Sequence, residues 1–100
     1  MAGAASTSPQ LDPGHPNARP PYPEASRHLR EEGTVLLLLH VTASGAVDEA
    51  RIEKSSGFGR LDRAAQNEAT KSWHFLPATR GGVSVATWHP YAVKFDLNAE

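Results

Sequence analysis

Apolar and small residues recur three and four positions apart between Leu61 and Trp73, which is the period of an amphipathic helix. The residues that share this face are Leu61, Ala64, Ala65, Glu68, Ala69, Ser72 and Trp73. Lys71 suits the negative last turn of such a helix, and Pro77 forbids its continuation. Because small side chains at its centre allow a close approach, we expect this helix to pack against a sheet.

Two segments upstream of this helix predict an antiparallel hairpin. The run from Thr34 to Thr42 carries valine and leucine on both faces, as expected of a central strand. Gly45 lies in the turn that follows and can adopt positive φ, so the segment from Val47 to Lys54 should return antiparallel. The apolar pattern of this second strand changes phase after its first residue, which indicates a bulge or a local twist near Asp48.

A third strand, continuous or interrupted, is predicted between Val83 and Leu97, after a glycine-rich turn at residues 80–82. Tyr91, Val93, Phe95 and Leu97 alternate there with small and charged residues, which is typical of a half-buried strand. Pro90 has no amide hydrogen to give to a ladder and is tolerated at an edge strand, a strand start or a bulge. The last strand is therefore expected at the border of the sheet.

A short helix is predicted from Glu24 to Glu32, with Pro23 at its start and Gly33 as a left-handed cap. The order of elements is then helix, strand, strand, helix, strand. Together they predict an α+β fold, in which a three-stranded antiparallel sheet with the strand order two, one, three packs against two helices. In this arrangement the third strand has one open edge.

Composition narrows the function classes. One hundred residues permit one domain, which we expect over residues 21–98. Residues 1–20 are poor in large apolar side chains, so we expect them to be a disordered linker end or a cloning tail. The formal charge of −1 provides no basic field, so no nucleic acid partner is expected. Cysteine is absent, and the longest apolar run is too short to span a bilayer.

Several short motifs, in order along the chain, resemble the C-terminal domain of TonB proteins. They are Pro21-Tyr22-Pro23-Glu24-Ala25, Glu32-Gly33-Thr34-Val35, Ser55-Ser56-Gly57, Leu61-Asp62, Lys71-Ser72-Trp73-His74-Phe75-Leu76-Pro77-Ala78 and Val93-Lys94-Phe95-Asp96-Leu97. Their order and spacing carry the resemblance, which covers about residues 20 to 97.

This resemblance implies a partner and a location. TonB C-terminal domains pair with the TonB box, an extended segment of outer-membrane transporters for siderophores, haem and cobalamin, and transmit work derived from the proton-motive force. The chain would then be a periplasmic fragment of a protein that an N-terminal helix, absent here, anchors in the inner membrane and connects to the proton-driven motor complex. Peptidoglycan is a further partner that the resemblance leaves open. A monomer or a weak homodimer is expected.

The open strand edge and the resemblance together predict where a partner binds. Unpaired backbone groups of an edge strand can accept another chain by strand addition. The residues expected to contact the partner are Tyr22, Pro23, Trp88, Tyr91, Ala92, Val93, Lys94, Phe95, Asp96 and Leu97. Plainer alternatives are that Tyr22 and Pro23 only pack the linker end on the domain, and that the edge pairs with a second copy of the chain. Trp73 and Phe75 are expected in the core.

The residues do not favour an enzyme. None of the five histidines has the spacing of a metal-ligand pair, so neither a metal nor a cofactor is expected. The neighbouring acids Glu31 and Glu32 are expected to point apart or into solvent, so they form no acid–base pair. Two other roles stay open, an envelope scaffold or peptidoglycan-binding module and a TolA-like transducer domain, although the S-S-G and W-x-F-x-P motifs favour the TonB resemblance over the TolA one.

Overall fold

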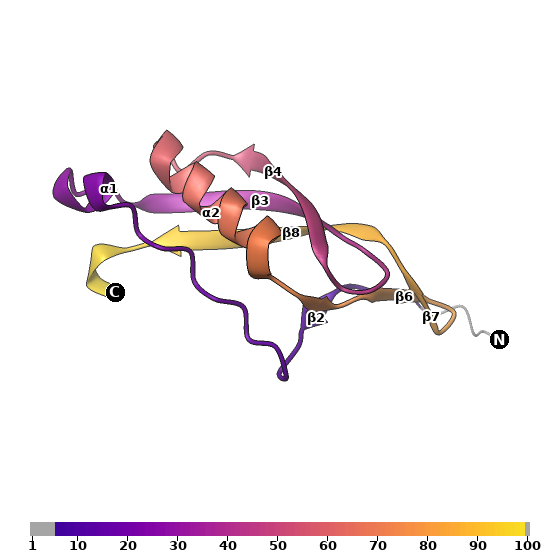
Figure 1. Ribbon diagram of the computed structural model, residues 1–100. Coiled ribbons are helices and arrows are strands. Elements are labelled where there is room, and N and C mark those ends of the chain that lie inside the picture. The colour runs from indigo at the N-terminus through magenta and orange to yellow at the C-terminus, as the bar shows by residue number, and fades with distance from the viewer. Residues whose placement is uncertain (1–5, 100) are drawn as a thin grey trace.

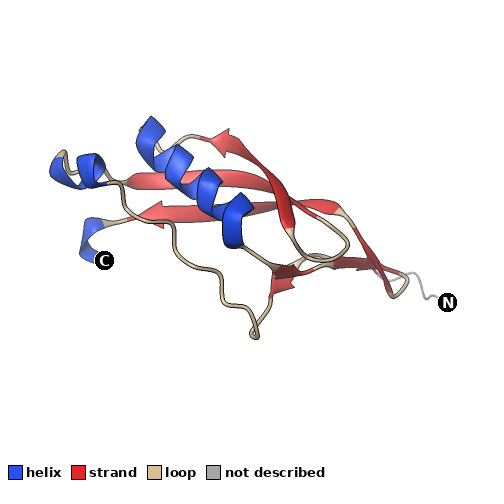
Figure 2. Ribbon diagram, viewed as in Figure 1, coloured by secondary structure: helices blue, strands red, loops and turns tan. Residues whose placement is uncertain are grey.

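The computed structural model describes residues 6–99 and has an elongated shape, with extents of 55 × 26 × 21 Å (Figure 1). Its main sheet is antiparallel and consists of β3 (Gly33–Val41), β4 (Val47–Lys54) and β8 (Thr87–Phe95), in the order β4-β3-β8. This order corresponds to the predicted second, first and third strands. Helix α2 (Gly59–Ser72) crosses one face of the sheet, and α1 (Glu24–His28) lies at one end (Figure 2). The α+β class is confirmed.

The core lies between α2 and the face of the sheet that it covers. Strand β3 contributes four completely buried side chains, Val35, Leu37, Leu39 and Val41. Helix α2 faces them with Leu61, Ala65 and Ala69, and Trp73 and Phe75 follow at the end of the helix. The predicted core aromatics are confirmed, and so is the predicted helix face except for Ser72, which is exposed. Within residues 6–99, no helix has the length and apolar character that crossing a membrane requires.

The first helix is shorter than predicted, and its cap is a different residue. It ends at His28, and Arg30, with a φ of 56°, takes the left-handed position. The backbone N–H of Glu31 donates to Ser26 O at 2.8 Å and that of Arg30 to Arg27 O at 3.1 Å, which is a Schellman closure. Gly33 serves another purpose, because a Cβ there would meet the backbone oxygen of Ser56 at 2.7 Å.

Glu31 and Glu32 were expected to point apart or into solvent, and the structure buries Glu31 and leaves Glu32 exposed. Its carboxylate accepts hydrogen bonds from Ser26 Oγ at 2.7 Å and from Arg60 Nη1 at 3.1 Å. Arg60 belongs to α2, so this ion pair connects the end of α1 to the start of α2. A buried carboxylate needs such partners, and no local pattern indicates that a residue 29 positions away supplies one.

Strand β4 has the bulge that the sequence predicts. Its register with β3 shifts between His40 and Val41, because Glu49 and Val47 are paired and Asp48 is passed over. A second shift, between Leu36 and Leu37, was not predicted. Beyond β4, Asp62 of α2 accepts hydrogen bonds from the Ser56 backbone N–H at 2.9 Å and from the Ser56 hydroxyl at 2.7 Å, which ties the end of this strand to the helix.

The predicted last strand is interrupted and ends earlier than expected. Residues Val83–Val85 form β7, which returns on β6 (Ala78–Arg80) as a hairpin, and the long strand β8 begins only at Thr87. The prediction that Leu97 belongs to this strand was wrong, because β8 ends at Phe95 and Leu97 starts the short 3-10 helix η1 (Leu97–Ala99). The Leu97 backbone N–H donates to Glu32 Oε2 at 2.9 Å, which turns the chain away from the sheet.

Residues 6–20, called here the N-terminal strap, lie against the domain. The strap contains β1 (Ser6–Thr7), which pairs with β6, and β2 (Gln10–Leu11), which pairs with β5 (Phe75–Leu76). Trp73 Nε1 donates to the strap at Ala18 O, at 2.7 Å. This placement differs from the expected disordered linker end, because backbone pairing needs no large apolar side chains. Residues 1–5 of the expected tail lie outside the described residues.

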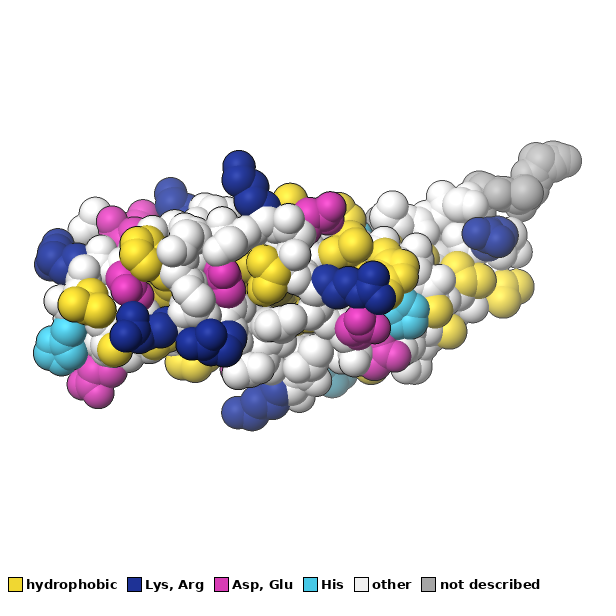
Figure 3. All heavy atoms as spheres, turned by 90° about the horizontal axis from the view of Figure 1, so that it is seen from above, with side chains coloured by type: hydrophobic (Ala, Val, Ile, Leu, Met, Phe, Trp, Pro, Cys, Tyr) yellow, Lys and Arg dark blue, Asp and Glu magenta, His cyan; other side chains and the backbone are white. Residues whose placement is uncertain are grey.

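Charged side chains of both signs are interspersed on the face seen in Figure 3, which looks down on the molecule from the side where α1 and β4 lie in Figure 1. The apolar side chains on this face are scattered between them. A mixed surface of this kind gives no long-range field of one sign.

Candidate functional site

Strand β8 is the open border of the main sheet. Among the described residues it pairs with β3 alone, in one continuous register from Gly33↔Phe95 to Val41↔Thr87. The prediction that Pro90 marks an edge strand is therefore confirmed. The backbone groups on the other side of β8 take part in no strand pairing.

The strap passes along this open border without forming a strand pair with it (Figure 1). Between the two lies an open cavity of about 350 Å³, and a second of about 150 Å³ adjoins it. Arg19, Pro20, Val93 and Lys94 line both cavities, which makes them one continuous depression. We call this depression, between residues 17–22 and Tyr91–Phe95, the edge groove.

Six of the ten predicted contact residues line the edge groove. These are Tyr22, Tyr91, Ala92, Val93, Lys94 and Phe95. Tyr22 also packs edge-on against Phe95, with ring centroids 5.4 Å apart, and its hydroxyl donates to the backbone oxygen of Glu31. These contacts support the interpretation that Tyr22 packs the linker end on the domain, and its contact with a partner stays a prediction.

The other four predicted residues lie elsewhere. Pro23 is the N-cap of α1 and is not among the residues that line the groove. Asp96 lines a separate cavity of about 360 Å³ beyond the end of β8, and Leu97 belongs to η1. Trp88 lies near the opposite end of β8, where its ring centroid is 4.8 Å from that of His40 and 4.4 Å from Arg51 Cζ.

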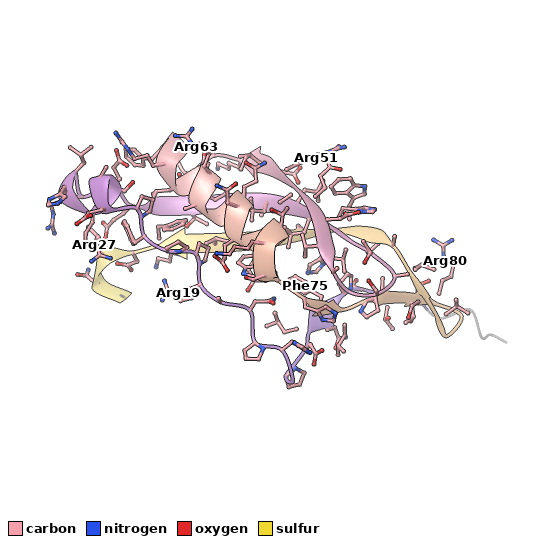
Figure 4. All side chains as sticks on the ribbon, viewed as in Figure 1. Arg19, Arg27, Arg51, Arg63, Phe75 and Arg80 are labelled. Atoms are coloured by element: carbon pink, nitrogen blue, oxygen red, sulfur yellow. The ribbon has the colours of Figure 1, made fainter. Side chains whose placement is uncertain are left out.

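The groove also contains residues that the sequence did not single out. Arg19 and Pro20 come from the strap and Arg27 from α1, and all three meet β8 at the larger cavity. Figure 4 shows Arg19 on the segment before α1 and Arg27 near the end of β8. No local pattern marks them, because more than sixty positions separate them from the strand that they face.

The charged and titratable groups of β8 differ in exposure. Lys94 Nζ lies 3.7 Å from Asp96 Oδ2, but the Lys94 side chain is 74% exposed, so this ion pair constrains it little. Burial lowers the pKa of His89, whose ring centroid lies 5.8 Å from that of Phe75.

Among residues 6–99, no three histidine, aspartate or glutamate side chains converge as a metal site. The groove therefore offers backbone groups, apolar surface and positive charge.

Comparison with known proteins agrees with this architecture. Residues 18–97 match the family of Gram-negative bacterial TonB protein C-terminal domains, and the chain belongs to this family. It is 44% identical over 82 residues to the protein tonB2 of Pseudomonas aeruginosa, which covers 82% of this chain and 30% of that protein. It is 41% identical over 80 residues to TonB of Neisseria meningitidis serogroup C, covering 80% of this chain and 26% of that protein. The chain thus spans less than a third of the length of either relative.

Proposed function

We propose that this chain is the periplasmic C-terminal domain of a TonB-type energy transducer, and that it binds the TonB box of outer-membrane transporters by strand addition along β8. The observation that carries the proposal is the unpaired border of β8 beside the edge groove. Family membership supports the transducer class, and the docking mode is our inference from the open edge. We propose no catalytic role and no cofactor.

The backbone of β8 suits the addition of a strand. A strand turns the backbone groups of successive residues alternately toward its two neighbours, and proline is tolerated where its missing N–H would face solvent. Pro90 therefore indicates that Ala92 and Lys94, two and four residues further on, direct their N–H groups outward. A partner strand along Tyr91–Phe95 would gain main-chain hydrogen bonds from them. Several such bonds along one strand can share a pulling load.

The remaining parts of the proposal concern the whole protein. We propose that the longer chain places an anchoring helix in the inner membrane, that this helix contacts the proton-driven motor complex, and that the work transmitted serves the uptake of nutrients such as siderophores, haem or cobalamin. The domain limits at residues 21–98, a monomeric or weakly dimeric state and a contact with peptidoglycan stay predictions.

An NMR titration with a synthetic TonB-box peptide tests the docking mode. We expect the backbone amide signals from Tyr91 to Phe95 to shift, with those of β4 unchanged, because only β8 has an open edge beside a groove. Sedimentation of the free chain is measured alongside, since a homodimer that pairs through β8 would occupy the same edge. Shifts confined to α2 or β4, or no shifts at all, would contradict the proposal.

A proline substitution sharpens this test. Ala92→Pro removes an outward N–H from β8 and should weaken peptide binding about tenfold or more, while the pairing with β3 is retained. The matched control is Glu53→Pro, because Glu53 is passed over in the register of β4 with β3. Unchanged affinity in the Ala92→Pro variant, with the native fold shown by circular dichroism, would show that the peptide binds elsewhere.

A further inference from the structure

We propose that His74 is a proton-controlled latch, which holds the N-terminal strap against the domain more tightly when the imidazole ring is charged. The latch lies just beyond the end of α2 and does not depend on the proposed docking along β8. There the His74 ring contacts the strap on one side and, on the other, the turn that connects β3 to β4.

One nitrogen of the His74 ring has a partner, and the other has none. Nε2 lies 3.0 Å from Ser44 O, and a carbonyl oxygen can only accept, so Nε2 carries a hydrogen. In the neutral ring, Nδ1 is then an acceptor. This atom is buried and has no hydrogen-bond partner among the described residues. A buried acceptor without a donor costs free energy, and a proton on Nδ1 turns it into a donor.

The strap places a carboxylate opposite this nitrogen. Asp12 Oδ2 lies 3.8 Å from His74 Nδ1, which is within the range of an ion pair but too long for a hydrogen bond. The local turn holds the Asp12 carboxyl group in place, because the Gly14 backbone N–H donates to Oδ1 at 2.9 Å. With a neutral ring, two acceptors face each other across this gap. With a charged ring, a donor faces the carboxylate, and the strap and the domain attract each other.

A second histidine opposes this attraction. The ring of His15, also on the strap, has its centroid 5.2 Å from that of His74, so two charged rings would repel each other. The turn on the other side of His74, residues 42–46, has no titratable side chain. His89 of β8 lies beside the next residue, Phe75, with ring centroids 5.8 Å apart. The added attraction is therefore present in mildly acidic solution, is lost as the pH rises and His74 becomes neutral, and is reduced when His15 is charged as well.

The latch matters because the strap covers strand edges. Strands β1 and β2 pair with β6 and β5 over two residues each, so few backbone hydrogen bonds hold them. Release of the strap uncovers these edges, and a bare strand edge is open to pairing with another extended chain. The charge of His74 thus controls how firmly the edges of β5 and β6 are covered.

The indole N–H of Trp73 reports whether the strap is docked, because it donates to Ala18 O of the strap at 2.7 Å. The chain has two tryptophans, so a Trp88→Phe variant identifies the NMR signal of Trp73. Histidine changes its charge between about pH 8 and 5, so hydrogen exchange of this N–H in the full chain is measured at pH 7.5 and pH 6 and expressed as protection relative to free tryptophan at the same pH. We expect about threefold greater protection at pH 6, since a partly exposed ion pair contributes little.

Three substitutions and a control locate the latch. Asp12→Asn should keep the protection seen at pH 7.5 and lose the rise at pH 6, because a neutral ring gains nothing from the carboxylate. His74→Gln should also abolish the dependence on pH, and His15→Gln should enlarge it. His28→Gln, at an exposed position on α1, should leave it unchanged.

Three outcomes would overturn the latch. One is equal protection at the two pH values in both the wild type and His15→Gln. Another is a rise at pH 6 that survives in Asp12→Asn. The third is a loss of protection at pH 7.5 in Asp12→Asn, because the carboxylate would then hold the strap without the charge of His74.

Discussion

The two border strands of the main sheet, β4 and β8, differ in how well their edges are protected from the addition of a further strand. Strand β4 carries five charged residues among eight, has two register shifts against β3, and has one backbone acceptor, Ala50 O, already bound by Gln66 Nε2 at 2.6 Å. Strand β8 carries one lysine among nine residues and keeps a single register along its whole length. Charges, bulges and covering side chains are the devices by which proteins protect a sheet edge from added strands.

This difference is consistent with the proposed docking of another chain along β8. A protein that had only to avoid aggregation would protect both borders, and β8 lacks most of the protection that β4 has. The edge groove lies beside the less protected border, so backbone groups and side-chain contacts are available at one place. We interpret the asymmetry as a functional feature of the sheet.

The largest effect is expected from the residue that supports both edges. Leu37, completely buried in the central strand, lies opposite Ile52 of β4 on one side and Tyr91 of β8 on the other. Leu37→Ala should lower the free energy of unfolding by about 2–5 kcal/mol, because it removes buried apolar contacts and leaves a cavity. Urea denaturation measures this loss. Leu76→Ala, at a side chain that is 43% exposed, should cost less than about 1 kcal/mol. Similar losses for the two variants would contradict a shared core beneath both edges.

A smaller effect is expected at the end of the protected edge. Partial burial alone would raise the pKa of Asp62, but hydrogen bonds from Ser55 and Ser56, with the nearby charge of Arg63, lower the pKa overall. A lowered folded-state pKa means that the stabilisation is present above the unfolded-state pKa and is lost as the pH falls through the folded-state pKa. Asp62→Asn should cost about 1 kcal/mol at pH 7.

Unfolding of the wild type and of Asp62→Asn, followed from pH 7 to pH 2, checks this expectation. The two stabilities should converge as the pH drops below about 4, where the carboxyl group becomes protonated. Glu53→Gln, an acid on β4 outside this hydrogen-bond network, is the control. A constant difference over the whole range would show that Asp62 acts through packing rather than through its charge.

The smallest effect is expected at the open edge and at higher pH. Because burial lowers the pKa of His89 on β8, the folded state binds its proton less readily than the unfolded state. The contribution of neutral His89 is therefore complete above about pH 6.5, the ordinary histidine value, and is lost as the pH falls from there toward the folded-state pKa. His89→Gln should flatten this part of the stability profile by less than about 1 kcal/mol, because solvent screens a side chain that is only partly buried. His28→Gln, at an exposed position on α1, is the control. An unchanged profile in His89→Gln would assign the dependence to another group.

The parts of the fold that local sequence specifies were predicted well. The face of α2 from Leu61 to Trp73, the bulge at Asp48 and the edge position of Pro90 each follow from residues that are neighbours in the chain. The end of α1 was predicted wrongly because Arg30 takes the left-handed cap position that a glycine usually occupies. Gly33 is instead needed where the backbone of Ser56 leaves no room for a side chain. The backbone of Ser56 reaches Gly33 only in the folded chain.

The candidate site likewise has one part that the sequence predicted and another part that it did not. The sequence predicted the strand residues from Tyr91 to Phe95, because alternation and a proline mark an edge strand wherever it folds. It did not predict that Arg19 and Arg27 would face that strand, nor that the strap would pair with β5 and β6.

The sequence by itself therefore determined the long helix, the three strands of the main sheet, the class of fold and the border position of β8, since periodicity, turn residues and proline act over a few neighbouring positions. Only the tertiary structure decided which residues line the groove at the open edge of β8 and which charges these residues carry. The physical reason is that the groove is built from the strap, α1 and β8, three segments that become neighbours when the core between α2 and the sheet is buried.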